Sequence, residues 1–147
     1  MQTWVAFLSA VAGGAIALAG QYLTRRLENR SRGGELLLEL CATVVALNED
    51  FRNRLWEERR LGQTGRVDGW DLAGTRLAEA RLRIVARDQR LLDALDEVTT
   101  SGGSLGSYWR RGQLEEGELQ RRSDRNKDAI AAFLRVARDV VGASFNI

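Results

Sequence analysis

The chain lacks proline and histidine, and its 147 residues include one cysteine, Cys41. The absence of proline removes the strongest helix breaker from the whole chain. The absence of histidine excludes Ser-His and Cys-His nucleophilic systems and zinc sites built from cysteine and histidine. A single cysteine excludes an intramolecular disulfide, and because Cys41 lies in the apolar run LLLELCATVVAL, we expect a small buried hydrophobe rather than a reactive thiol.

Excess charge of one sign is also missing. The 22 basic and 20 acidic residues give a net charge of +2, and no basic stripe is interleaved with aromatic residues, so nucleic-acid binding is not expected. Leu, Arg and Ala are the commonest residues, and strand-like alternation is hard to find. These features predict an all-α fold.

Residues 1–24 contain no charged side chain, and they predict an N-terminal transmembrane helix. A helix over residues 3–23 is about 30 Å long, which matches the hydrocarbon core of a bilayer. Arginines follow the span at once, so the positive-inside rule predicts a single-pass protein of the cell membrane, with its N-terminus outside and the rest of the chain in the cytoplasm. The residues expected at the membrane interface are Trp4, Tyr22, Arg25, Arg26, Arg30 and Arg32.

A cleaved signal peptide and a helix buried in a soluble core are the two alternatives to a membrane anchor. A cleaved signal peptide should begin with positive charges and have a short apolar core, whereas here the charges follow a long core. A helix buried in a soluble core would need a much larger partner domain to cover it on all sides.

Small residues recur along this segment at alternating spacings of four and three. Such a stripe allows close approach of helices in lipid, and its period is typical of left-handed packing. Because the chain offers no second span, the partner would be another copy or another protein; an Ala/Gly-rich anchor also produces such a stripe by chance. The predicted packing positions are Ala6, Ala10, Gly13, Ala17 and Gly20.

Residues 25–34 form a basic juxtamembrane segment, and residues 35–147 predict a cytoplasmic three-helix antiparallel bundle. Helices are expected at about 35–61, 70–99 and 115–141, with a turn-rich connection at 62–69 and a loop at 99–107. The first of these helices can be continuous with the span, because no proline separates them.

Apolar ladders mark the expected contact face of each helix. In the second ladder the slot between Ile84 and Leu91 falls on Arg87 or Asp88, which either form a buried ion pair or turn to solvent. The first ladder, expected to make helix–helix or oligomer contacts, is Leu37, Leu40, Val44, Leu47, Phe51 and Leu55. The second is Ala73, Leu77, Ala80, Ile84, Leu91, Leu95 and Val98, and the third is Leu119, Ile130, Phe133, Leu134, Ala137 and Val140.

No catalytic or cofactor motif is present. The glycine-rich GGSLGS lacks the GK[ST] ending of a phosphate loop, and adjacent acidic residues are typical of solvated helix faces. We therefore expect no enzymatic activity, no metal or other cofactor and no small-molecule substrate. The juxtamembrane arginines can also attract anionic lipids, at roughly 1 kcal/mol per basic residue.

The runs AVAGGAIALAGQYLTRRLENRSR, residues 10–32, and ARLRIVARDQRLLDALDEV, residues 80–98, resemble small single-span membrane proteins of GC-rich actinobacteria and their phages. That resemblance implies an Ala/Gly-rich anchor followed by a helical cytoplasmic domain, and it implies no particular activity.

The sequence thus favours a non-enzymatic, membrane-anchored helical scaffold or adaptor that self-associates or docks onto a larger complex. The alternative is a pore-forming or membrane-disrupting effector of the phage-lysis or abortive-infection type. It ranks second because only Ser9 and Gln21 offer a polar face in the span. A third hypothesis is that the protein is a soluble regulator whose N-terminus is buried in a complex.

Overall fold

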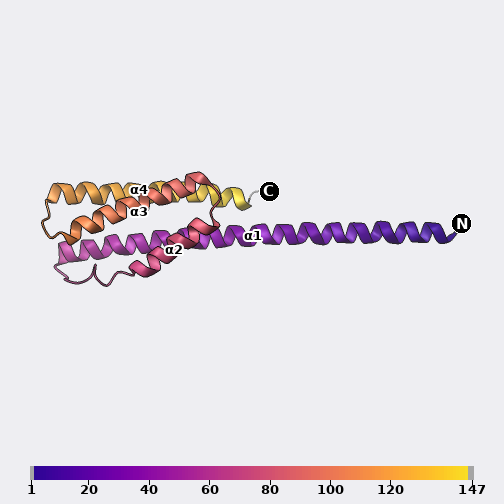
Figure 1. The fold of residues 1–147 in the computed structure, drawn as a ribbon, viewed down its shortest axis with the longest axis horizontal. Helices are drawn as coiled ribbons and strands as arrows, with labels where there is room; N and C mark the ends of the chain where they lie inside the picture. The colour runs from indigo at the N-terminus through magenta and orange to yellow at the C-terminus, as the bar shows by residue number, and fades with distance from the viewer. Residues whose placement is uncertain (1, 146–147) are drawn as a thin grey trace.

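The computed structural model describes the backbone of residues 2–145, and the side chains of Gln21, Arg25, Glu28 and residues 32–145. Four α-helices follow one another, and no strand is present over residues 2–145: α1 (Gln2–Leu61), α2 (Leu72–Val85), α3 (Gln89–Arg110) and α4 (Glu116–Phe145). Successive helices run in opposite directions, and α1 extends far beyond the other three (Figure 1). The all-α prediction is confirmed, but the bundle has four helices where the sequence suggested three.

Helix α1 is one uninterrupted helix of 60 residues, about 90 Å long. It passes through Gly33 and Gly34 without a break, and it joins the expected span to the expected first bundle helix. The bundle begins near Gly34, where the ring of Phe145 at the end of α4 lies against the glycine. The glycine at this position lets the end of α4 approach α1 closely.

Among the residues whose side chains are described, no helix is long and apolar enough to cross a membrane. The expected span, residues 1–24, lies outside that part of the chain except for Gln21.

The connection after α1 is as turn-rich as the sequence predicted. Gly62 adopts a positive φ of 66°, a conformation that ends a helix readily only at glycine. Helix α2 then begins at an N-cap, because the carboxylate of Asp71 accepts a hydrogen bond from the backbone N–H of Gly74 at 2.8 Å.

The expected single helix over residues 70–99 is wrong, because the chain breaks after Val85 and restarts at Gln89. Asp88 caps α3 by accepting a hydrogen bond from the N–H of Arg90 at 2.9 Å, and it also pairs with the Arg90 guanidinium. Arg87 is exposed. The polar interruption in the ladder is therefore a helix boundary rather than a buried ion pair.

The break also moves the buried face of α2. Leu77 and Ile84 of the predicted ladder are 53% and 83% exposed, whereas Ala78 and Leu82 are buried. Ala73 and Ala80 are exposed as well, and only Leu91, Leu95 and Val98, which belong to α3, are buried as expected. One ladder cannot run through two helices that point in opposite directions.

The loop expected at 99–107 is also wrong, because this segment is the middle of α3. Two of its three glycines, Gly102 and Gly106, lie where α3 packs closely against other helices. A Cβ at Gly102 would lie 3.4 Å from Asn126 Nδ2 and 3.5 Å from Asn48 Oδ1, and one at Gly106 would lie 3.4 Å from the Phe51 ring. Here glycine serves close packing rather than a turn.

Helix α4 begins at Glu116 and runs to Phe145, a few residues beyond the expected end at 141. It packs against α1 and α3, while α2 packs against α1. Two apolar clusters form the core, a larger one at the end nearer Gly34 and a smaller one around Phe51, Leu55, Leu105 and Leu119. Buried polar residues lie among these clusters, and Asn126 donates a hydrogen bond to Ser101 Oγ at 3.1 Å. On the third ladder, Leu134 is exposed and Val140 partly buried, while the other four residues are buried.

Candidate interaction surface

The first ladder of α1 faces the core of its own bundle. Leu37, Leu40, Val44, Phe51 and Leu55 are buried, and Leu47 is partly buried against them. This face therefore closes the bundle within one chain, and any partner must use a different side of α1.

The residues assigned to the membrane divide into two groups. Arg25 and Arg32 are exposed. The side chains of Trp4, Tyr22, Arg26 and Arg30, and those of the packing positions Ala6, Ala10, Gly13, Ala17 and Gly20, lie outside the described part of the chain. The backbone at all these positions is helical.

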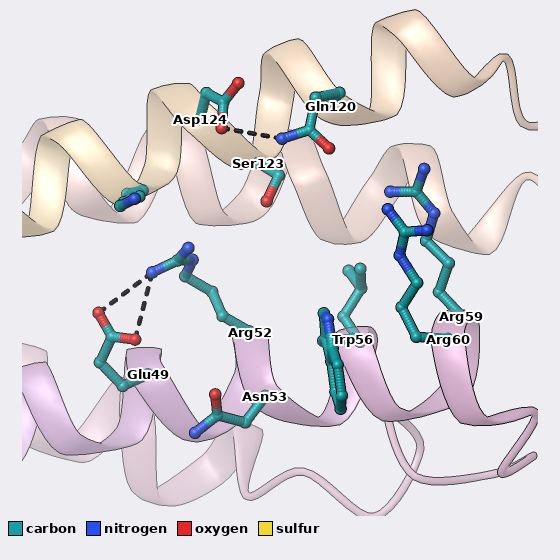
Figure 2. A pocket seen from close by; sticks show the side chains of 11 residues that line it. Glu49, Arg52, Asn53, Trp56, Arg59, Arg60, Gln120, Ser123 and Asp124 are labelled. Atoms are coloured by element: carbon teal, nitrogen blue, oxygen red, sulfur yellow. Dashed lines mark hydrogen bonds and ion pairs between the residues drawn. The ribbon is translucent and has the colours of Figure 1, made fainter.

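A groove of about 380 Å³ lies between α1 and α4 (Figure 2). Helix α1 contributes Glu49, Arg52, Asn53, Trp56, Arg59 and Arg60 to its walls, and α4 contributes Gln120, Ser123, Asp124 and Lys127. The large indole of Trp56 is 54% exposed. Exposed tryptophan and arginine side chains are enriched where proteins bind other proteins.

The charges of this groove are only partly neutralised within the chain. Arg52 pairs with Glu49 at 3.2 Å, yet its Nε is buried without a hydrogen-bond acceptor. Arg59 pairs with Glu116. Within the described part of the chain, Arg60 and Lys127 have no ion-pair partner. The groove can therefore accept additional acidic groups.

The same two helices form an apolar hollow of about 390 Å³ nearer to Gly34. Leu38 and Leu134 stand at its edges and are 51% and 46% exposed. Cys41 lies at its base and is 4% exposed, and burial raises the pKa of its thiol to about 11. The expectation that Cys41 is a buried hydrophobe is confirmed. Such a thiol is almost fully protonated near neutral pH and is a poor nucleophile.

A third cleft of about 260 Å³ lies between α1, α2 and α3 and is lined by both polar and apolar side chains. Asn48 and Thr75 lie in it and are almost fully buried. Burial raises the pKa of Glu79, and Thr99, Arg83 and Arg76 partly offset that effect. The cleft therefore contains one half-buried acid beside a threonine hydroxyl.

Sequence reasoning missed both the open face of α1 and the buried polar residues. Asn48 lies four residues after Val44 and three before Phe51, next to the ladder position assigned to Leu47, so helical spacing alone could have identified it. The open groove depends on how α4 packs against α1, and nothing in the spacing along either helix reveals that.

Among the residues with described side chains, no three His, Cys, Asp or Glu side chains are grouped so that they could hold a metal ion. No protein-family model matches the chain, and neither the curated proteins nor the solved structures include a significant match.

Proposed function

We propose that this chain is a non-enzymatic scaffold or adaptor, anchored in the cell membrane by one N-terminal span and presenting a cytoplasmic four-helix bundle to a partner. The observation that carries the proposal is the continuity of α1. Gln2–Leu61 is one helix, and its first 32 or so residues, about 48 Å, extend beyond the bundle (Figure 1). An isolated projection without charged residues up to position 24 needs apolar surroundings to cover it.

The same continuity sets the distance between membrane and bundle. About ten residues separate the end of the expected span from Gly34, where the bundle begins, which corresponds to roughly 15 Å of helix. Exposed Arg25 and Arg32 lie on this stretch of helix, between the expected span and the bundle. There they are suited to contact with anionic headgroups. The bundle would then stand just off the bilayer surface with its α1–α4 groove open to a partner.

The anchor is tested by carbonate extraction of membranes from cells that express the full chain. We expect the protein in the membrane pellet and expect Ile16→Arg, which adds a charge to the span, to move most of it to the soluble fraction. Leu77→Arg, at an exposed position of α2, is the matched control and should leave the distribution unchanged. Wild-type protein in the soluble fraction would contradict the anchor.

A scaffold should also leave the membrane potential intact. A potential-sensitive dye in the same cells measures this directly. Loss of the potential on expression, absent from cells that make Ile16→Arg, would contradict the scaffold proposal and favour the pore-forming effector.

A further inference from the structure

The open α1–α4 face is complementary in charge to itself. Helices α1 and α4 are antiparallel, and the ion pair between Arg59 and Glu116 shows which of their residues stand at the same height. By this register Glu49 stands level with Lys127, and Arg52 stands level with Asp124. All four line one groove. Glu49 and Arg52 on α1 therefore each face an opposite charge at about the same height on α4.

A twofold axis parallel to the helices would pair these opposite charges between two copies of the chain. It brings α1 of each copy into the groove of the other, facing the second copy's α4 at equal height. Lys127, which has no ion-pair partner among the described residues of its own chain, then meets Glu49 of the second copy. Arg52 likewise meets Asp124 of the second copy.

The apolar end of the face fits the same arrangement. Ala42 stands level with Leu134, and Leu38 lies one turn from Ala42 on α1. The two half-exposed leucines would be covered by those of the second copy. Burying this hollow adds a hydrophobic contribution to dimerisation at the end of the bundle nearer the membrane. The charged part of the groove makes no such contribution.

The angular positions of residues around the axis of α1 relate this face to the projecting segment. At 3.6 residues per turn, Leu38 lies about seven turns from position 13, and Glu49 lies about ten turns from it. Both therefore fall on nearly the same side of the helix as position 13. Val44, which is fully buried in the chain's own core, falls about 140° away. The stripe at positions 6, 10, 13, 17 and 20 and the open groove thus share one side of one uninterrupted helix.

We propose that the α1–α4 groove binds a second copy of this chain in a parallel twofold dimer, whose seam continues from the bundle into the membrane along one side of α1. This inference rests on the proposed function, because insertion in one direction makes the two copies parallel. An antiparallel pair would place the two projecting segments at opposite ends and leave both without a partner.

Disulfide crosslinking in membranes of cells that express the full chain tests the seam. In a Cys41→Ala background, Ala42→Cys lies on the proposed seam, and Thr43→Cys is the matched control, exposed but about 100° further round α1. We expect an oxidised dimer from Ala42→Cys that is at least tenfold more abundant than from Thr43→Cys. Equal crosslinking at the two positions, or none at Ala42→Cys, would overturn the dimer. A crosslinked product that contains a different protein would overturn it as well.

Charge reversal tests the pairing across the seam. Glu49→Lys and Lys127→Glu should each weaken dimerisation roughly tenfold, because like charges then meet twice, and the double variant should restore it. Asp96→Lys reverses a charge in the Arg83–Asp96 pair between α2 and α3, and it should leave the dimer unchanged. A double variant as weak as either single one would contradict the proposed register.

Failure of the dimer and failure of the anchor give different results. Protein that stays in the carbonate pellet without crosslinking at Ala42→Cys refutes the dimer and leaves the anchor standing. Protein in the soluble fraction refutes the anchor and removes the basis for parallel copies. Gly13→Leu separates the two further, because it should reduce Ala42→Cys crosslinking without releasing the protein from the membrane.

Discussion

The indole N–H of Trp70 donates a hydrogen bond to the backbone carbonyl oxygen of Leu47 at 2.9 Å. The Trp70 ring also lies against Phe51, with centroids 4.7 Å apart and planes inclined by 40°. Leu47 and Phe51, one turn apart on α1, thus hold Trp70 in place two residues before α2 begins. This contact fixes where the turn-rich connection delivers the chain to the start of α2.

Replacing Trp70 should therefore loosen the attachment of α2. Trp70→Phe keeps most of the apolar contact but removes the donor, and should lower the free energy of unfolding by about 1 kcal/mol. Trp70→Ala removes both and should lower it by about 3 kcal/mol. Denaturant unfolding in detergent, followed by circular dichroism, measures the two values. Equal losses for the two variants would show that the hydrogen bond contributes nothing.

The buried face of α2 can be tested with two residues that are close in sequence. Leu82 is fully buried and Ile84 is 83% exposed, so Leu82→Ala should cost about 3 kcal/mol and Ile84→Ala less than about 0.5 kcal/mol. The predicted ladder through Leu77 and Ile84 implies the opposite order. The same denaturant titration decides between them.

Helical spacing predicted the core of α1 well and that of α2 poorly, and the reason is physical. Along α1 a single phase holds from Leu37 to Leu55, because nothing interrupts the helix. In α2 two pairs of apolar residues could form the buried face, Leu77 with Ile84 or Ala78 with Leu82. Only the packing of α2 against α1 decides that the second pair is buried. The helix boundary at Asp88 depends on a local N-cap, and from the sequence alone the same polar slot is equally compatible with a buried ion pair or a turn of the helix towards solvent.

The open groove could not be predicted from the sequence, for a different reason. Its α1 residues are the polar side of an amphipathic helix, which alone predicts contact with solvent. Only the antiparallel register with α4 shows that Glu49 and Arg52 stand level with opposite charges.

Glycine-to-alanine exchange tests whether residues 99–107 are helical. Nothing lies within 4 Å of a Cβ built at Gly103, so Gly103→Ala should raise stability by roughly 0.5–1 kcal/mol through helix propensity. Gly103→Pro should lower it by about 3 kcal/mol, whereas a loop would tolerate proline. Gly112, which has a φ of 71°, is the contrasting position, where alanine should destabilise the protein. A neutral Gly103→Pro would contradict the continuous α3.

Protonated Glu79 should contribute to the stability of the folded protein, and this contribution should weaken as pH rises. Burial raises the pKa of this carboxyl above its ordinary value of 4.5, so the folded state binds the proton more tightly than the unfolded state does. Its contribution is complete below pH 4.5 and is lost as pH rises through the folded-state pKa. Glu79→Gln should therefore match the wild type near pH 4 and exceed its stability at pH 7. Glu39→Gln, at an exposed position of α1, is the control for removing one acidic group. A Glu79→Gln variant that is less stable than the wild type at pH 7 would contradict the burial argument.

The buried thiol of Cys41 should react slowly while the protein is folded. A rise in its pKa from 9.0 to about 11 lowers the thiolate fraction at pH 8 about a hundredfold, and burial blocks the approach of a reagent as well. We expect maleimide labelling of the folded protein to be at least a hundredfold slower than labelling in denaturant. In the variant that combines Cys41→Ala with Thr43→Cys, the exposed thiol should react at a rate close to that of the unfolded chain. If Cys41 reacts as fast as a cysteine at position 43, the hollow between α1 and α4 opens to solvent, and its lining is then not packed as described.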